Sequence, residues 1–291
     1  MKLHLIDGTY ELFRAYYGVP SAKSPDGQEV GAVLGLIQTL LSLLRQSDVT
    51  HVGCAFDSVV ESFRNQLFDS YKTSEGMPAD VKNQFPLAEL AAEALGIVVW
   101  PMVEFEADDG IATAVVRWEM SLEVDQIVIC SPDKDLAQMV KGSRVVLLDR
   151  RRRLTMDEEG VKEKFGVYPK SIPDYLALVG DAADGIPGIP KWGAKTASTV
   201  LQRYVHIEEI PDSHLVWDVS VRGAQGASES LMASREDAYL YRTLAILRSD
   251  VTLPQTLGDM EWKGVPRDKY VAFCSSMGFD KLMELPHKWL S

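Results

Sequence analysis

Short apolar runs with the length of buried β-strands alternate with helical patterns through the first half of the chain. The strand-like runs cover residues 2–6, 49–56, 97–100, 126–130 and 144–148. Between them, apolar residues recur every three or four positions, as they do on one face of an α-helix, and residues 30–44 are the clearest case. Strands and helices that alternate in this way form a mainly parallel sheet flanked by helices. The sequence therefore predicts an α/β fold for this half.

In the second half, near residue 156, the strand pattern stops and helical patterns replace it. They cover residues 157–165, 172–179, 193–204, 235–247 and 267–277, with a long loop expected at 215–228. A length of 291 residues is compatible with one or two domains. We therefore predict an α/β domain at residues 1–155 and a C-terminal helical subdomain at residues 156–291.

Carboxylates follow four of the predicted strands at the points where these strands end. They are Asp7, Asp57, Glu106, Asp108, Asp109, Asp133 and Asp135. Because the carboxyl ends of parallel strands meet at one edge of a sheet, we expect these side chains to converge. Each one taken alone is better explained as a turn former or a helix cap than as a metal ligand. Seven at one edge favour a metal site, since clustered carboxylates repel one another unless a cation compensates them.

The segment 180–197 adds two carboxylates, a glycine-rich hairpin and the start of a helix. Asp181 and Asp184 lie on a predicted tight turn, and Lys195 and Thr196 open the helix. The free N–H groups of a helix N-terminus favour a bound phosphate. Ligand sets made only of oxygen suit Mg²⁺ or Mn²⁺ better than zinc, and a pair of such ions can clamp a phosphodiester. The combination indicates phosphodiester chemistry.

Three features leave alternatives open. The run of four arginines at 150–153 favours a solvated turn, with contact to DNA as the alternative. Trp192 either contacts a sugar–phosphate edge or packs under the hairpin. Lys134 stands between two aspartates and is a candidate internal counter-charge.

Composition and charge limit the function and the location. The net charge of −12 argues against a protein that coats nucleic acid non-specifically, although carboxylates at a metal site contribute to it. The three cysteines, at positions 54, 130 and 274, are expected to be reduced and buried rather than paired. No apolar run approaches the length of a membrane span, and no signal peptide is evident. We therefore expect a cytoplasmic protein without membrane association.

The ordered motifs of the chain resemble those of the 5′-nuclease family. This family comprises the 5′–3′ exonuclease domain of bacterial DNA polymerase I, its stand-alone relatives and the flap endonucleases. The motifs are Leu5-Ile6-Asp7-Gly8, Ala55-Phe56-Asp57, Phe63-Arg64, Tyr71-Lys72, Phe105-Glu106-Ala107-Asp108-Asp109, Ser131-Pro132-Asp133-Lys134-Asp135-Leu136, and the segment 180–197. The resemblance implies a PIN-like α/β core with an arch at about 69–95. It also implies a helix–three-turn–helix module that binds DNA at about 172–204.

The resemblance also implies roles for individual residues. The metal ligands would be Asp7, Asp57, Glu106, Asp108, Asp109, Asp133, Asp135, Asp181 and Asp184. They would hold two or more Mg²⁺ or Mn²⁺ ions, and backbone carbonyls of the hairpin would hold K⁺. The catalytic residues would be Lys72, at the scissile phosphate, with Arg64, Asp7 and Asp133. The DNA-binding residues would be Tyr71, Lys72, Gly188, Lys191, Gly193, Lys195 and Thr196.

Three features depart from the family pattern, and one of them is the pair Lys191-Trp192, which stands in the hairpin where the family usually has smaller residues. Glu75 stands where the family usually has an arginine, so a carboxylate there would repel phosphate. Gly185 stands where the family usually has an asparagine after the last metal-binding aspartate.

The implied function is that of a divalent-metal-dependent, structure-selective 5′ nuclease, with 5′–3′ exonuclease and flap endonuclease activity in DNA replication or repair. Its expected partners are DNA with 5′ ends, flaps or junctions, the RNA of primers, and a DNA polymerase. A monomer is expected. The first alternative is a DNA-junction-binding protein whose nuclease activity is vestigial or needs a partner. A weaker one is a PIN-like ribonuclease.

Overall fold

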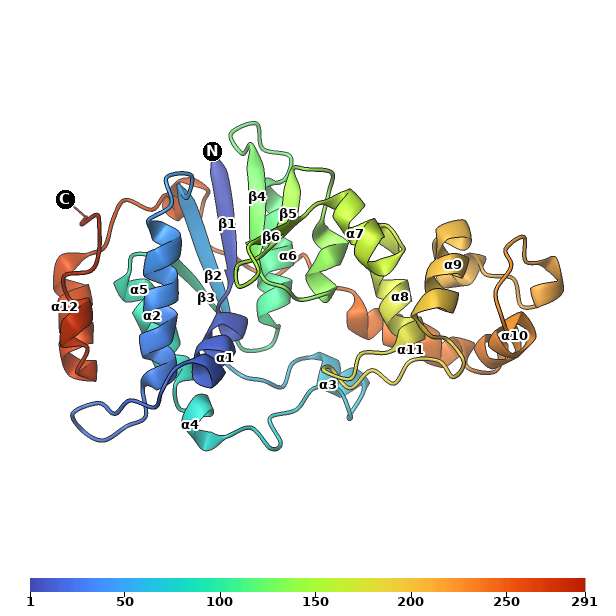
Figure 1. Cartoon of the computed structure of the whole chain (residues 1–291), viewed down its shortest axis with the longest axis horizontal. Coiled ribbons are helices and arrows are strands. Elements are labelled where there is room, and N and C mark those ends of the chain that lie inside the picture. Colours follow the sequence, from blue (N-terminus) through green and yellow to red (C-terminus); the bar gives the residue numbers. More distant parts are fainter. Residues whose placement is uncertain (291) are drawn as a thin grey trace. The chain divides into compact units, whose positions relative to one another are not determined.

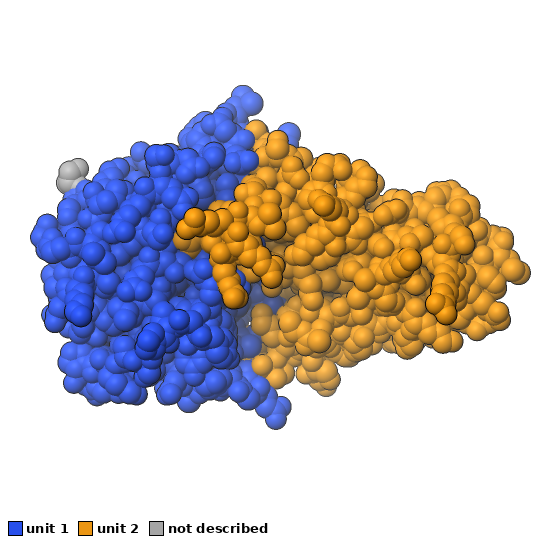
Figure 2. Space-filling view, viewed as in Figure 1, with its two compact units in different colours: residues 1–60, 74–131, 248–291 blue, residues 61–73, 132–247 orange. Residues whose placement is uncertain are grey.

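The computed structural model describes residues 1–290, and the chain divides into two compact units (Figure 2). Unit 1 comprises Met1–Val60, Ser74–Ser131 and Arg248–Ser291. Unit 2 comprises Glu61–Thr73 and Pro132–Leu247. Each unit is built from segments that are distant in the sequence. The predicted boundary at residue 155 stays a prediction.

Unit 1 contains four strands that pair in parallel in the order β3-β2-β1-β4 (Figure 1). They are β1 (Lys2–Asp7), β2 (His51–Asp57), β3 (Val98–Met102) and β4 (Gln126–Cys130). All seven residues of β2 are buried, as expected of a parallel strand covered on both faces. The strands agree with the predicted runs to within a residue or two at their ends. The predicted α/β fold with a mainly parallel sheet is confirmed.

Helices cover the strands of unit 1. They are α1 (Gly8–Gly18), α2 (Gly31–Leu44), α4 (Ala79–Lys82), α5 (Phe85–Ala94), α6 (Ala107–Trp118) and α12 (Arg267–Met277), with the short 3-10 helices η5 (Gly258–Met260) and η6 (Asp280–Leu282). Helices α1 and α2 pack closely at Gly35, where a Cβ would lie 2.9 Å from the Cβ of Ala15. Helix α6 packs on β1, β2 and β3 and begins just beyond the carboxyl end of β3.

Unit 2 is mainly helical and carries one hairpin of strands. Its helices are α3 (Arg64–Leu67), α7 (Glu158–Phe165), α8 (Ile172–Val179), α9 (Ala194–Tyr204), α10 (Ala224–Ala233) and α11 (Arg235–Ala245). Its 3-10 helices are η1 (Asp135–Met139), η2 (Pro169–Ser171), η3 (Ile207–Glu209) and η4 (His214–Val216). Its strands β5 (Val145–Asp149) and β6 (Leu154–Met156) pair antiparallel.

Two local predictions for unit 2 were wrong. Strand β6 was not predicted because it is short and mostly exposed, so it lacks an apolar pattern. The loop expected at 215–228 ends early, because α10 begins at Ala224 and buries Ala227 and Leu231 on one face. The glycine and serines in that helix have low helix propensity, so the sequence did not indicate a helix there, and packing outweighs this low propensity.

The arginines at 150–153 form the turn of the β5–β6 hairpin, where the last three are exposed.

The segment between α8 and α9 is a tight hairpin. The backbones of Asp181 and Ile186 exchange two hydrogen bonds of 2.8 Å, and Ile189 donates to the carbonyl of Leu178. Gly188 adopts φ +75°, and a Cβ there would lie 2.6 Å from the nitrogen of Gly180, so only glycine fits without displacement. This hairpin holds Asp181 and Asp184 on a fixed turn beside α8.

Candidate metal centre

The predicted ligands of unit 1 lie at the carboxyl edge of its parallel strands. Asp7 ends β1 and Asp57 ends β2. One oxygen of Asp7 accepts the backbone N–H of Tyr10 at 2.8 Å and so caps α1, while the other accepts the hydroxyl of Ser131 at 2.9 Å. The side chain of Asp57 accepts the backbone N–H of Ala107 at 2.7 Å. This bond links the end of β2 to the first turn of α6.

The remaining predicted ligands of unit 1 lie at the N-terminus of α6. Glu106 is the N-cap, and it forms a capping box with Asp109, whose carboxylate accepts the backbone N–H of Glu106 at 3.0 Å. Asp109 also accepts the backbone N–H of Arg248 at 2.8 Å. Asp108 is half-buried. Helix capping is sufficient to explain the positions of these carboxylates. Their role as metal ligands therefore stays a prediction.

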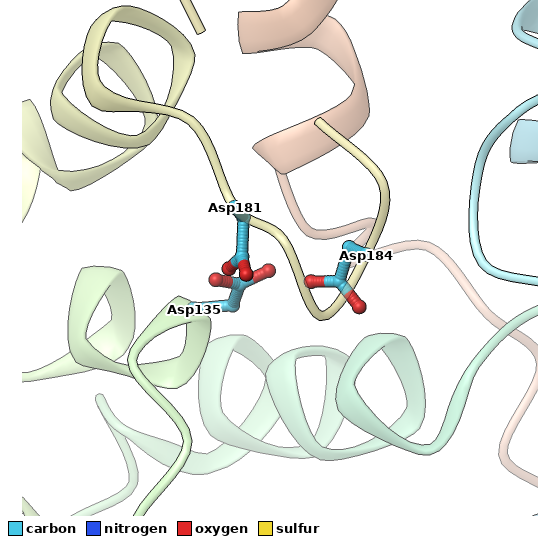
Figure 3. A group of neighbouring side chains, drawn as sticks. All are labelled: Asp135, Asp181 and Asp184. Atoms are coloured by element: carbon cyan, nitrogen blue, oxygen red, sulfur yellow. The ribbon is translucent and has the colours of Figure 1, made fainter. Parts of the chain in front are cut away.

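In unit 2, three predicted ligands come together. One carboxylate oxygen from each of Asp135, Asp181 and Asp184 lies within 4.8 Å of the others. Figure 3 shows the carboxylates of Asp135 and Asp181 facing each other, with Asp184 beside them on the hairpin turn. Asp135 and Asp181 are buried, and Asp184 is half-buried. A fourth acid, Asp133, is exposed and accepts the backbone N–H of Asp135 at 2.9 Å.

The electrostatics of this cluster favour a bound cation. Burial, followed by the charges of Asp133, Asp184 and Asp181, raises the pKa of Asp135 well above its ordinary value, and Lys134 offsets only part of this. Among residues 1–290, the buried Oδ1 of Asp135 has no hydrogen-bond partner. A buried carboxylate oxygen without a donor is a suitable ligand for a hard divalent ion, and the three residues therefore fit a Mg²⁺ or Mn²⁺ ion.

The residue predicted to contact the phosphate, Lys72, is joined to this cluster by a backbone hydrogen bond. Lys72 is half-buried, and its backbone N–H donates to the carbonyl of Asp184 at 3.0 Å. The neighbouring Tyr71 is 3% exposed, so its ring offers almost no surface to a ligand. Arg64 is 1% exposed, and its guanidinium donates to the carbonyls of Leu244 and Ile246 at 2.8 and 3.0 Å. These contacts suit Arg64 to holding α3 in place, and its catalytic role stays a prediction.

The predicted DNA-binding residues of the hairpin and α9 differ in exposure. Gly193 is the N-cap of α9 and makes no side-chain cap, Lys195 is exposed on the first turn, and Thr196 is half-buried. The ammonium end of Lys191 lies along Gly226 of α10, 3.0 Å from where a Cβ would stand. Trp192 is buried, and its indole donates to the carbonyl of Ala227 at 2.9 Å. Of the two alternatives for Trp192, the structure therefore favours packing under the hairpin.

Sequence reasoning missed one residue beside the site. The side-chain amide of Asn65 donates to the carbonyls of Tyr71 and Lys72 at 3.0 and 3.1 Å. The only sequence signal was an amide-bearing residue in a short helix, and that pattern is too common to indicate a contact.

Comparison with known proteins identifies the family. The model of the 5′-3′ exonuclease N-terminal, resolvase-like domain matches residues 2–166, and that of the 5′-3′ exonuclease C-terminal SAM fold matches residues 167–268. The chain is 34% identical to a 5′-3′ exonuclease of Buchnera aphidicola over 251 residues, which cover 86% of this chain and 82% of the relative. It is also 34% identical to DNA polymerase I of Pseudomonas aeruginosa, over 97% of this chain and 31% of that protein.

A solved structure shares the fold. The flap endonuclease of bacteriophage T5, in a complex with DNA and metal ions, matches with a TM-score of 0.65 and 19% identity over 98% of this chain and 96% of that one. The shared fold is a mainly parallel α/β sheet flanked by helices, with carboxylates at the carboxyl edge of its strands. The chain belongs to the 5′-3′ exonuclease family, which confirms the resemblance. It spans about a third of the length of the DNA polymerase I relatives it matches. Within residues 1–290, every helix is too short or too polar to cross a membrane.

Proposed function

We propose that this chain is a divalent-metal-dependent, structure-selective 5′ nuclease that hydrolyses DNA phosphodiester bonds near 5′ ends, flaps or junctions, as in replication or repair. The observation that carries the proposal is the cluster of Asp135, Asp181 and Asp184, with an unpartnered buried oxygen, in a chain of the 5′-3′ exonuclease family. Repelling carboxylates are costly to bury without a cation, so the cluster is better explained as a site than as packing.

The ligands are carboxylate oxygens, which suit Mg²⁺ or Mn²⁺. Asp135, Asp181 and Asp184 hold an ion through the oxygens that lie close together. We propose the same role for the other predicted ligands, which are Asp7, Asp57, Glu106, Asp108, Asp109 and Asp133. When bound, two or more such ions supply a nucleophile from water and stabilise charge on the phosphate oxygens.

The chain's own groups bind and orient the strand. Lys72, whose backbone is bonded to Asp184, contacts the scissile phosphate with its ammonium, and Tyr71 and Arg64 support it from the buried side. The open first turn of α9, with Gly193, Lys195 and Thr196, binds a backbone phosphate. The hairpin with Gly188 and Lys191 lies against the same strand, and its carbonyls hold K⁺. Selectivity then comes from the shape of the nucleic acid and its backbone, not from base sequence.

Further parts of the proposal concern the cellular setting. The substrate is DNA, with the RNA of primers as a second one. We keep the monomeric state, a DNA polymerase as partner, the cytoplasmic location, and the division into a nuclease core at 1–155 and a helical subdomain at 156–291 as proposals.

The test is cleavage of an end-labelled 5′-flap DNA in Mg²⁺ by the wild-type chain and by Asp135→Asn. This substitution removes one charge from the cluster and keeps the shape of the side chain. We expect wild-type cleavage and a loss of about 100-fold or more in the variant, as is typical when a group that stabilises the transition state is removed. Equal rates would overturn the metal site. Flap binding in Ca²⁺ without cleavage in Mg²⁺ would favour the junction-binding alternative, and cleavage restricted to RNA would favour a ribonuclease.

A further inference from the structure

Backbone contacts between residues 70–72 and residues 184–185 join the segment of Lys72 to the turn that carries Asp184. We call this set of contacts the latch. The backbone N–H of Lys72 donates to the carbonyl of Asp184 at 3.0 Å. Close to this bond, the carbonyl of Ser70, two residues before Lys72, lies 2.3 Å from the point where a Cβ on Gly185 would stand. Any side chain at 185 would push the two segments apart, since real Cβ atoms do not approach an oxygen so closely.

The same segment is held from its other side by Asn65. Its amide nitrogen donates to the carbonyls of Tyr71 and Lys72, and its amide oxygen accepts the backbone N–H of Ser62 at 2.9 Å. Three hydrogen bonds therefore fix the orientation of a single side chain. Both backbone polar groups of Lys72 are hydrogen-bonded: its N–H donates to the carbonyl of Asp184, and its carbonyl accepts from the amide of Asn65.

Helix α3, which carries Asn65, is itself anchored. The adjacent Arg64 is buried, and its guanidinium donates to the carbonyls of Leu244 and Ile246, which end α11. Charged donors on backbone carbonyls make strong hydrogen bonds in a buried setting. The hydrogen bonds from Asn65 to the Lys72 segment, which we call the clamp, therefore come from a helix that is fixed to α11 and not from a free loop.

We propose that Asn65 and Gly185 are positioning residues for the nuclease reaction. Together they hold the backbone of Lys72 at a fixed place beside Asp184 before any substrate binds. The inference rests on the proposed function, in which Lys72 contacts the phosphate and Asp184 holds metal. A lysine on a free loop would be ordered only when substrate binds, whereas the latch supplies that order in advance. Positioning matters because a misplacement of about 1 Å can cost about 100-fold in rate.

The experiment breaks the latch from each side. Asn65→Ala removes the clamp, and Gly185→Ala adds a Cβ atom against the carbonyl of Ser70. The matched controls are Gln66→Ala, an exposed neighbour of Asn65, and Gly76→Ala, which places the same side chain on a similar left-handed backbone (φ +80° against +73° at residue 185) with nothing within 4 Å of its Cβ position. The difference between the two glycine variants isolates the steric effect at residue 185. Two independent variants keep the test valid if one fails to fold, which thermal unfolding will show.

Two measurements decide the outcome. Amide hydrogen exchange of a peptide covering residues 69–73, without metal, should speed up by about tenfold in both latch variants and stay unchanged in both controls. Turnover of the flap substrate should fall by about 10- to 100-fold in the latch variants, with binding in Ca²⁺ within about threefold of wild type.

Unchanged exchange in both latch variants would overturn the latch. Faster exchange with unchanged turnover would overturn its positioning role, and a loss of binding equal to the loss of turnover would assign the segment to binding alone. If the wild-type chain does not cleave, the proposed function fails and the positioning role fails with it, while the exchange data still show whether the latch exists.

Discussion

The Nζ of Lys134 lies 2.6 Å from Oδ2 of Asp181, an aspartate that is 1% exposed. Asp133 and Asp135 flank this lysine in the sequence. Burial by itself lowers the pKa of Lys134, but the hydrogen bond to Asp181 and the charges of all three aspartates outweigh it, so that the pKa is raised. An ammonium group therefore compensates part of the negative charge of the cluster without any metal. Lys134 is the internal counter-charge that its place in the sequence suggested.

This ion pair predicts an effect of Lys134→Met on stability. Without metal, the variant should lose about 1–3 kcal/mol of unfolding free energy, less than for a fully buried pair because Lys134 is 36% exposed. Millimolar Mg²⁺ should stabilise the variant more than the wild type, since the ion no longer competes with the ammonium for Asp181. Thermal unfolding with EDTA and with Mg²⁺ measures both effects. Lys170→Met, at an exposed site, is the control, and equal Mg²⁺ shifts in all three proteins would contradict the prediction.

The buried indole of Trp192 predicts a change in stability rather than in DNA binding. Trp192→Phe removes the buried hydrogen bond from the indole to the carbonyl of Ala227. It also weakens the contact with Trp217, whose ring centroid lies 6.0 Å away. We expect a loss of about 1–2 kcal/mol in unfolding free energy. Flap affinity in Ca²⁺ should stay within about twofold of wild type. A clear loss of affinity at unchanged stability would instead mean that the indole contacts DNA.

Lys195 is exposed on the first turn of α9, so its substitution should change DNA binding rather than stability. Lys195→Ala should weaken flap binding and lower the slope of log Kd against log salt by about 1, as expected when one phosphate contact is lost. Stability should be unchanged. Binding titrations over a salt series measure the slope. Lys281→Ala, at an exposed site in unit 1, is the control. An unchanged slope in Lys195→Ala would remove this residue from the DNA contact.

Much of the fold could be predicted because parallel strands have a clear sequence signature. Strands β1, β2 and β4 are buried along almost their whole length, and Asp7 and Asp57 directly follow apolar runs, so their place at the carboxyl edge follows from topology. Strand β6 and helix α10 could not be found, because one is exposed and the other depends on packing of Ala227 and Leu231. Local propensity carries no information on either.

The contacts around the acidic cluster were harder to predict than the acids themselves. Because clustered carboxylates repel one another, their convergence indicates a cation site from the sequence alone. The approach of Gly185 to Ser70 and the clamp of Asn65 on Lys72 depend on backbone groups, which every residue has. Such contacts appear only when the chain is folded. The same holds for Arg64, whose burial and carbonyl partners could not be read from its charge.

Glu75 offers a test of how charge near the predicted arch controls substrate capture. It is exposed, and it stands three residues after Lys72, where the resemblance to the 5′-nuclease family implies an arginine. Glu75→Arg replaces a repelling carboxylate by a phosphate-binding guanidinium, so flap affinity or cleavage rate should rise by about three- to tenfold at low salt. The gain should shrink as salt increases, because exposed charges are screened.

The matched control for Glu75→Arg is Glu123→Arg. It makes the same change of charge at an exposed site just before β4, at the amino edge of the parallel strands and away from the carboxyl edge where Asp7 and Asp57 end. A gain in Glu75→Arg alone would place the effect at the predicted arch, and an equal gain in both variants would reduce it to net charge. If Glu75→Arg and the wild type bind and cleave equally across the whole salt series, residue 75 does not approach the phosphates of the substrate.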